Sequence, residues 1–456
     1  MNVLLLNPPT GNNQKFIREG RCAQEEKVWS ALWPPISLAT IAAVLDRDGH
    51  NVRIIDAPAQ NIGWNAIPSW INTCLPDIVI WSTGTPSIKS DLELASVIKR
   101  MNPEIKTAVF GTHVTVLDKQ CMEGFPDLDF IIRNEPELTA RDLVAALKNN
   151  SSLGNVSGLT FRDEHNKTIQ NPARPFIENL DELPFPSWQK LDPGRYRLPL
   201  KRRRYLMISP QRGCPYSCTF CNCQTYYGSR LRKRSPESIV NEIERNIHEF
   251  GTRDFFFWAE TFVINKDHVR EICLSIIDRG LKISWVANSR VDTVDPALLR
   301  LMAKSGCWMI SYGIESGDQE ILNRTGKGIE VKQAEDAIRY AGDAGIKTVG
   351  HFILGLPGET EESIKRTIDF AADSRLDFAQ FYCAVPFPGS TLYEQALKEG
   401  WVRKAVDFSQ FNQDREVMAL PSISPGLVKK YRGVACKKFY LNRKRVSGIF
   451  SLLFNR

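Results

Sequence analysis

Three cysteines in one short loop are the residues of this sequence best suited to chemistry. Cys214, Cys218 and Cys221 lie in the segment RGCPYSCTFCNC (212–223), directly after an apolar segment at 205–211. Cysteine thiolates are the standard ligands of iron–sulfur clusters. A 4Fe–4S cluster held by only three of them keeps one iron free for another molecule, which an enzyme requires and a simple electron carrier does not. We therefore predict a catalytic cluster with these three cysteines as its metal ligands.

Two other interpretations of the loop are a structural zinc site and a further ligand at Cys223. Zinc sites usually show a second pair of ligands at matching spacing, and the sequence offers none. Cys223 falls outside the spacing of the other three, so we expect it to be a neighbour of the cluster and not a ligand.

The elements that must position this loop form a series of strand–helix repeats. Apolar segments suited to strands lie at 205–211, 253–260, 282–290, 308–315, 347–355 and 378–386, with amphipathic helical segments between them. Repeats of this kind predict a parallel (β/α)6 partial TIM barrel, whose chemistry belongs at the carboxyl ends of the strands. The cysteine loop follows the first of these strands.

The loop, with the aromatic Phe220 just before its third cysteine, resembles the signature of the radical SAM superfamily. The resemblance implies that the free iron binds the amino and carboxylate groups of S-adenosylmethionine (SAM). An electron from the cluster then breaks a sulfur–carbon bond, and the resulting 5′-deoxyadenosyl radical abstracts hydrogen. It also implies SAM contacts at the strand ends, which we assign to Phe220, Ala259, Glu260, Ser289, Arg290, Glu315, Ile353 and Gly355.

Some of these contacts have a chemical reason of their own. Arg290 suits a carboxylate because its planar fork donates two hydrogen bonds, and Gly355 allows close backbone approach to the adenine. Glu260 stands where the family often has Gly-Gly-Glu, but the glycines are absent here. An ion pair at the barrel rim is the alternative for Glu260.

The first part of the chain also alternates strands and helices. Apolar strands at 3–7, 52–56, 78–82, 107–111 and 130–133 predict a Rossmann-like parallel sheet covered on both faces. Ligands of such sheets lie at the carboxyl ends of the strands. A domain of this kind before a radical SAM barrel resembles the cobalamin-binding-domain class of the superfamily. That resemblance implies cobalamin contacts at Asp56, Ser82, Thr83, Thr85, Gly111, Thr112, His113 and Glu135.

One feature of many cobalamin proteins is missing. The Asp-x-His-x-x-Gly motif that supplies an axial histidine does not occur, so we expect His113 to be a loop residue and not an axial ligand. Relatives in the class commonly lack the motif, so cobalamin stays our expectation. The alternative is a domain that keeps the fold without the cofactor.

Length and composition bound the remaining choices. A chain of 456 residues exceeds what one hydrophobic core organises. We expect a cobalamin-type domain at 1–150, a linker with a short hairpin at 151–200, the barrel at 201–395 and a helical, basic region at 396–456. No secretory signal or membrane span is visible. With 11 cysteines and no export signal, reduced thiols in the cytoplasm are expected.

These features predict an enzyme that functionalises an unactivated carbon. The first choice is cobalamin-dependent C-methylation of a small-molecule or lipid-like intermediate. A ring-forming, ring-contracting or other radical rearrangement is the alternative, since the chain most resembles the group of the anaerobic magnesium-protoporphyrin cyclase and of hopanoid side-chain enzymes. A second alternative is a non-catalytic iron–sulfur redox protein.

Partners follow from charge and chemistry. The cluster needs an external reductant such as flavodoxin or ferredoxin, and the basic run at 201–204 is either a solvated linker or its docking site. A net charge of +7 and no RNA-binding domain argue against nucleic acid. The end of the chain, KKFYLNRKRVSGIFSLLFNR, fits either contact with the inner face of the cell membrane or a helix that caps the barrel. We expect a monomer or homodimer.

Overall fold

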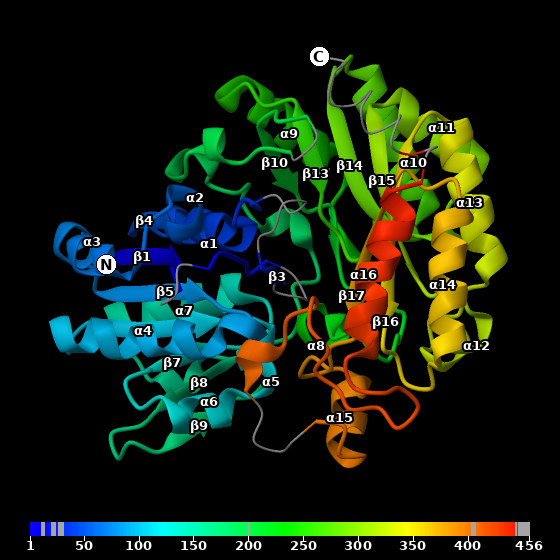
Figure 1. Cartoon of the computed structure of the whole chain (residues 1–456). Coiled ribbons are helices and arrows are strands. Elements are labelled where there is room, and N and C mark those ends of the chain that lie inside the picture. The colour runs from blue at the N-terminus through cyan, green and yellow to red at the C-terminus, as the bar shows by residue number, and fades with distance from the viewer. Residues whose placement is uncertain are drawn as a thin grey trace.

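The computed structural model of the chain contains two large sheets that lie beside each other (Figure 1). It describes residues 1–10, 14–19, 24–25, 32–198, 201–402, 407–442 and 445. The first sheet has the strand order β4-β1-β5-β6-β7-β8-β9, and the second has the order β10-β13-β14-β15-β16-β17. Among the described residues, no helix has the length and apolar character needed to cross a membrane.

The first sheet has a parallel core with helices on both faces, as predicted. Its parallel strands are β1 (Asn2–Asn7), β4 (Asn51–Asp56), β5 (Ile78–Ser82), β6 (Lys106–Phe110) and β7 (Phe130–Ile132). One face packs on α1 (Ile36–Arg47) and α7 (Pro136–Lys148), and the other on α3 (Ile67–Cys74) and α4 (Ile88–Met101). Alternate residues of each strand therefore enter two different apolar cores, which explains the near-continuous apolar strand sequences.

The hairpin that we expected in the linker belongs to the first sheet. Strands β8 (Leu159–Arg162) and β9 (Thr168–Gln170) pair antiparallel with each other, and β8 pairs antiparallel with β7. Since β7 would otherwise present an open edge, the hairpin covers its free backbone groups. The sheet thus extends to residue 170.

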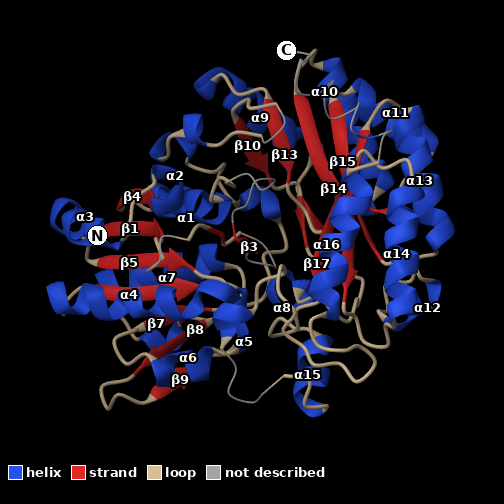
Figure 2. Ribbon diagram, viewed as in Figure 1, coloured by secondary structure: helices blue, strands red, loops and turns tan. Residues whose placement is uncertain are grey.

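The second sheet consists of six parallel strands with helices over one face (Figure 2). The strands are β10 (Tyr205–Ile208), β13 (Asp254–Phe257), β14 (Ser284–Arg290), β15 (Cys307–Glu315), β16 (Lys347–Leu354) and β17 (Phe378–Cys383). The covering helices are α9 (Pro236–Phe250), α10 (Lys266–Asp278), α11 (Pro296–Lys304), α13 (Val331–Asp343) and α14 (Glu361–Asp373). Several begin at a capping side chain, such as Ser235 before α9 and Asp295 before α11. The predicted partial barrel is confirmed.

The carboxy-terminal region returns to both sheets. After α15 (Thr391–Lys398), the short helix η9 (Phe408–Gln410) lies against η2 (Thr85–Ser87) of the first sheet's domain. Helix α16 (Leu427–Tyr440) then runs along β17 (Figure 1). Arg432 Nε donates to the carbonyl of Phe381 at 2.8 Å, and the Tyr440 hydroxyl donates to that of Ala379 at 2.7 Å.

Helix α16 covers the edge of the barrel and includes only the first four residues, 437–440, of the segment for which a cap or a membrane contact was expected. The final segment, 446–456, lies outside the described residues.

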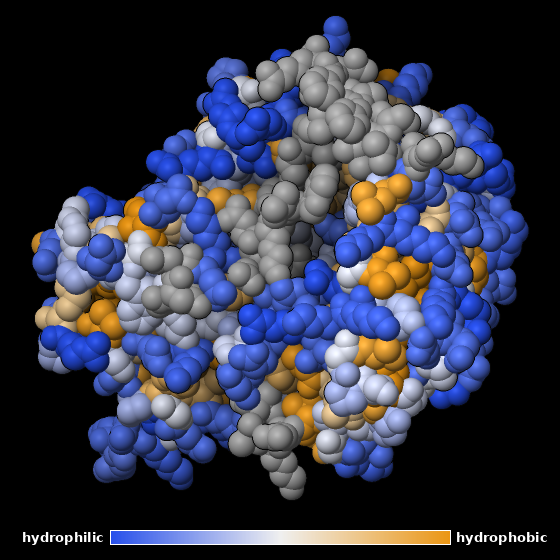
Figure 3. Space-filling view, viewed as in Figure 1, coloured by the Kyte–Doolittle hydropathy of each residue, from blue (hydrophilic) through white to orange (hydrophobic). Residues whose placement is uncertain are grey.

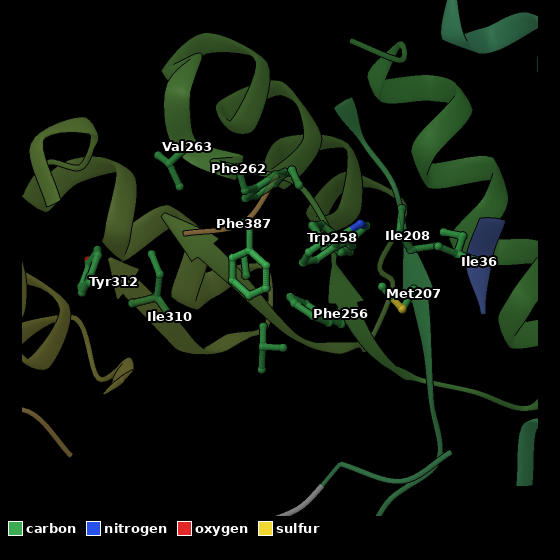
Figure 4. Close-up of a cluster of buried hydrophobic side chains, with 14 of the residues drawn as sticks. Ile36, Met207, Ile208, Phe256, Trp258, Phe262, Val263, Ile310, Tyr312 and Phe387 are labelled. Atoms are coloured by element: carbon green, nitrogen blue, oxygen red, sulfur yellow. The ribbon is translucent and has the colours of Figure 1, made fainter. Parts of the chain in front are cut away.

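The two sheets share one continuous apolar core. Trp33, just before α1, packs edge-on against Phe256 at 5.3 Å and Trp258 at 4.8 Å between ring centroids. Figure 4 shows Ile36 of α1 beside Ile208 of β10. On the face shown in Figure 3, the described side chains are mostly hydrophilic, with hydrophobic ones in small separate patches. The position of the first domain against the barrel therefore rests on buried packing.

Candidate active site

The cysteine loop is held between two short strands at the carboxyl end of the barrel. Strands β11 (Gln211–Arg212) and β12 (Arg232–Lys233) pair antiparallel on either side of it, and α8 (Cys223–Tyr227) lies within it. Gly213 has φ +88°, and a Cβ there would stand 2.2 Å from the carbonyl oxygen of Arg230. Only glycine permits this backbone approach, so the turn into Cys214 depends on it.

The thiols of the loop lie close to one another. Cys214 and Cys223 are buried, whereas Cys218 and Cys221 are partly exposed. The backbone N–H of Cys223 donates to Cys221 Sγ at 3.4 Å. Hydrogen bonds of its thiol to Cys214 and Cys221 raise the pKa of Cys223 well above its usual value. Cys223 thus lies beside Cys214 and Cys221, and its exclusion from the cluster ligands stays a prediction.

Three cysteine thiolates are a donor set that suits an iron–sulfur cluster. Among the described residues, no three His, Cys, Asp or Glu side chains converge as ligands of one metal ion. Cluster ligands bind different irons, so they surround a volume and need not converge. Two buried acceptors at the loop, Gln211 Oε1 and Asn222 Oδ1, have no hydrogen-bond donor in the described part of the chain. Because buried polar atoms are normally paired, these acceptors fit a ligand that carries donors, such as the ammonium group of SAM.

A buried ion pair stands at the end of β15, next to the loop. Lys327 Nζ lies 2.5 Å from Glu315 Oε1, and it also lies 6.0 Å from the centre of the Phe220 ring. Glu315 has φ +67°, a strained conformation for a residue other than glycine. Such strain concentrates at functional sites, where the surrounding structure enforces it. Lys327 was missed by the sequence analysis, because nothing in its local sequence links it to Glu315.

Arg290 approaches the loop from β14. Its guanidinium lies 3.6 Å from the centre of the Tyr216 ring and donates to the carbonyl of Lys327 at 2.7 Å. It also pairs with Asp292 at 2.8 Å. The structure therefore brings Arg290, Lys327 and two aromatic rings of the cysteine loop together, and the contact of Arg290 with a SAM carboxylate stays a prediction.

The other predicted SAM contacts lie at the same ends of the strands. Ala259 and Glu260 follow β13 and are buried, and Ile353 is buried on β16. The Ser289 hydroxyl is engaged with Thr293 at 3.1 Å. Gly355 has φ +85°, and a Cβ there would meet Val428 of α16 at 3.1 Å. The space that Gly355 leaves is thus lined by the carboxy-terminal helix, which the sequence did not indicate.

Glu359 holds the turn after β16. Its carboxylate accepts hydrogen bonds from the backbone N–H groups of Gly355 at 2.5 Å and Leu356 at 3.0 Å. Burial raises the pKa of Glu359 to about 8, although these two hydrogen bonds oppose the rise. The carboxyl group is therefore largely protonated at neutral pH. It fixes the backbone at the position assigned to the adenine.

The predicted cobalamin contacts gather at the carboxyl edge of the first sheet, but the chain itself covers them. Asp56 accepts from the Tyr196 hydroxyl at 2.7 Å and from Asn7 at 2.9 Å. Thr83 donates to Asp91 at 2.8 Å, and Arg18 pairs with the same Asp91 at 2.6 Å. The remaining predicted contacts Ser82, Thr85, Gly111 and Thr112 are buried along this edge. A small cleft lined by Asn7, Arg18, Glu19, Trp33 and Ser82 lies beside them.

His113 belongs to this covered edge. Its Nδ1 lies 3.3 Å from Thr85 Oγ1, and its ring packs edge-on against Phe408 of η9 at 4.5 Å. Burial lowers the pKa of His113 to about 3, so the imidazole is neutral. The hydroxyl groups of this edge suit the amide-rich rim of a corrin. Arg18 and Phe408 cover this edge, and the contacts of its residues with cobalamin stay predictions.

Glu135 follows β7 at the carboxyl edge of the first sheet. It precedes α7 and faces the cysteine loop, where it pairs with Arg212 and Arg232. Its contact with cobalamin stays a prediction, and both of its carboxylate oxygens already accept hydrogen bonds from these arginines.

Comparisons with known proteins agree with this geometry. The family model of the radical SAM superfamily matches residues 208–371, and that of the B12 binding domain matches residues 29–144. An uncharacterised methyltransferase of Pyrococcus horikoshii is 33% identical over 97% of this chain and 93% of its own length. The anaerobic magnesium-protoporphyrin IX monomethyl ester cyclase of Rubrivivax gelatinosus is 29% identical over 90% of this chain and 74% of its own.

Solved structures show the same fold. The cobalamin-dependent SAM radical enzyme OxsB, with aqua-cobalamin and SAM bound, superposes with a TM-score of 0.77 at 19% identity, over 98% of this chain and 70% of that one. The radical SAM methyltransferase TsrM of Kitasatospora setae gives 0.70 at 16% identity, over 99% and 91%. With the matches in sequence, these place the chain in the radical SAM superfamily, in the group of enzymes that carry a B12-binding domain before the radical SAM barrel.

Proposed function

We propose that this enzyme cleaves SAM reductively and uses the 5′-deoxyadenosyl radical to methylate a carbon atom of a small molecule with the help of cobalamin. Cys214, Cys218 and Cys221 would hold a 4Fe–4S cluster, which supplies the electron for cleavage when bound. The observation that carries this proposal is the meeting of the cysteine loop with Arg290 and the Lys327–Glu315 pair at one edge of a six-stranded parallel sheet.

The residues around the loop have separable tasks in this proposal. Gln211 Oε1 and Asn222 Oδ1 are acceptors for the ammonium of SAM, and Phe220 offers an aromatic face to the adenine. Arg290 and Lys327 place positive charge where the carboxylate would lie. Ser82, Thr83 and Thr85 would hold cobalamin at the edge of the first sheet, which faces the barrel.

The inner face of the barrel offers a place for the substrate. Phe352 and Phe381 point outward, toward Phe370 of α14 and Phe439 of α16. Because strand residues alternate between faces, His351 and Tyr382 point to the opposite, inner face, where both are partly buried. His351 Nδ1 lies 3.4 Å from the Tyr382 hydroxyl. His351 is also the strand partner of Gly313, two residues before Glu315. A substrate held there would lie beneath the SAM site.

Anaerobic reconstitution tests the cleavage step. Protein loaded with iron and sulfide, reduced with dithionite and given SAM is expected to form 5′-deoxyadenosine, measured by mass spectrometry. The Cys218→Ser variant is expected to form none, while Cys74→Ser, which changes a cysteine of the first domain outside the loop, is expected to match the wild type. A wild type that holds a reducible cluster and forms no 5′-deoxyadenosine would contradict the proposal.

A ring-forming reaction is the second candidate, supported by the likeness to the magnesium-protoporphyrin cyclase over 90% of this chain. SAM with a deuterated methyl group separates the two outcomes. Methyl transfer puts deuterium into the product, and ring formation leaves the product unlabelled.

We place the reaction in the cytoplasm, with flavodoxin or ferredoxin as electron donor. The basic run at 201–204 has exposed arginines but precedes β10, whereas the cysteine loop follows the carboxyl end of that strand. Docking of the donor on this run would therefore bring it to the wrong end of the barrel. Lys201 itself packs over the ring of Trp308 at 4.2 Å, which supports a structural role for the start of the run.

A further inference from the structure

The two arginines that bracket the cysteine loop bind the same carboxylate of the other domain. Arg212 and Arg232 are direct partners across the β11–β12 pair, so they stand at the entrance and the exit of the loop. Arg212 Nη1 donates to Glu135 Oε1 at 3.2 Å, and Arg232 Nη1 donates to it at 2.8 Å. Glu135 lies at the start of α7, in the first domain. The Glu135 side chain therefore binds both ends of the cysteine loop.

A second carboxylate completes the group. Glu137, in the first turn of α7, accepts from Arg212 Nη2 at 2.6 Å and from Arg212 Nη1 at 3.2 Å. This is the bidentate geometry that fixes an arginine most firmly. The linker joins as well, because the N–H of Ile177 donates to Glu135 Oε2 at 2.8 Å and its carbonyl accepts from Arg232 at 2.8 Å.

The group is buried and balanced in charge. The exposed fractions of the side chains are 1% for Glu137, 3% for Glu135, 3% for Arg232 and 11% for Arg212. Two carboxylates face two guanidinium groups, so these four side chains together carry no net charge. Because charges interact strongly where water is excluded, a change at any one of these side chains leaves an uncompensated charge close to the loop. Arg212 is only two residues from Cys214.

We propose that Glu135, Glu137, Arg212 and Arg232 are positioning residues that fix the cluster loop against the B12-binding domain and set the reduction potential of the cluster. The proposal rests on the proposed function, because it requires a cluster at Cys214, Cys218 and Cys221. Reduction adds one negative charge to a cluster. Loss of a carboxylate should therefore raise the potential, and loss of a guanidinium should lower it.

A redox titration followed by electron paramagnetic resonance tests this with the reconstituted full-length protein. Glu137→Gln is expected to raise the midpoint potential and Arg212→Met to lower it. Arg212→Lys keeps the charge and is expected to stay near the wild type. If the four side chains only held the loop in place, Glu137→Gln and Arg212→Met would both loosen it. Their midpoint potentials would then shift in the same direction or not at all.

The loop also supplies a matched control. Arg230 and Glu178 form an ion pair of 2.9 Å between the same loop and the linker, but their side chains are 77% and 63% exposed. Arg230→Met and Glu178→Gln should leave the potential unchanged, because water screens these charges.

The outcomes separate the two proposals. If Arg212→Met fails to fold, Glu137→Gln and Arg212→Lys still test the inference. The inference is overturned if the midpoint potential of Glu137→Gln rises no more than that of Glu178→Gln. A wild type that binds no cluster overturns the proposed function instead.

Discussion

Lys327 Nζ lies 2.5 Å from Glu315 Oε1, and their side chains are only 7% and 9% exposed. The pair joins a strained strand end to the turn after α12 (Gln319–Arg324), beside the ring of Phe220. Burial of two opposite charges is tolerated only while both are present, because either one alone is left without compensation.

Replacing Lys327 by methionine should therefore damage both stability and catalysis. We expect a loss of about 3–5 kcal/mol in the free energy of unfolding, since a buried carboxylate loses its partner. Formation of 5′-deoxyadenosine should fall by about 10- to 100-fold, because the strand end beside the proposed SAM site shifts. Urea unfolding and a SAM cleavage assay measure the two effects. Lys332→Met, which breaks an exposed pair with Glu335, should cost less than about 1 kcal/mol. Equal effects of the two variants would refute the expectation.

Gly213→Ala should prevent assembly of the cluster. The added Cβ would stand 2.2 Å from the carbonyl oxygen of Arg230, so the turn into Cys214 must open. The control is Gly251→Ala, since Gly251 has a φ of +63° and nothing within 4 Å of its Cβ position. The free energy of unfolding of that variant should fall by only about 1–2 kcal/mol, because alanine is strained in a left-handed backbone conformation. Iron content per chain is the measurement. A normal content in Gly213→Ala would show that the turn is not needed.

Tyr382→Phe should separate SAM cleavage from substrate turnover. The variant loses the hydroxyl that contacts His351 and Gln380 on the inner face of the barrel. Cleavage of SAM without substrate should continue at the normal rate. Product formation should fall by about 2- to 10-fold, the value of one hydrogen bond. The product is measured in cells fed methyl-labelled methionine. It is the labelled metabolite that forms only when the cells contain this protein. Tyr340→Phe, on α13, serves as the control. A parallel fall in SAM cleavage would argue against a substrate role.

The stability of the turn after β16 should depend on pH through Glu359. Its pKa is raised from 4.5 to about 8 in the folded protein, with burial as the main cause. The folded state thus holds a proton that the unfolded state has lost, and stability falls as the pH rises from about 4.5 toward 8. Glu359→Gln should remove this slope and become more stable relative to the wild type as the pH increases. Urea unfolding between pH 5 and about 8.5 tests it; parallel curves for the two proteins would contradict the prediction.

Local sequence was enough to predict the strands and the edge where their ends meet. Apolar runs such as 78–82 and 347–355 became central parallel strands, and the cysteine loop follows the first barrel strand as expected. The roles of single charged residues were harder to predict. The family resemblance implied a cobalamin contact for Glu135, but its partners Arg212 and Arg232 lie 77 and 97 residues away. Pairings over such separations are fixed by how the domains pack, which no local pattern records.

The carboxy-terminal region was the least predictable part for the same reason. Its composition allowed either a membrane contact or a cap on the barrel, and only the tertiary structure shows Arg432 and Tyr440 hydrogen-bonded to β17. The contact between His113 and Phe408 joins segments almost 300 residues apart. No periodicity in either segment indicates it.

The bonds from α16 to β17 have a consequence for how the chain can be shortened. Arg432 and Tyr440 occupy backbone groups of an outer strand of the second sheet. A truncated protein that stops before Leu427 would expose these groups as a template for a strand from another copy. Helix α16 thus protects the edge of the second sheet from pairing with another molecule, and a shortened protein should retain it.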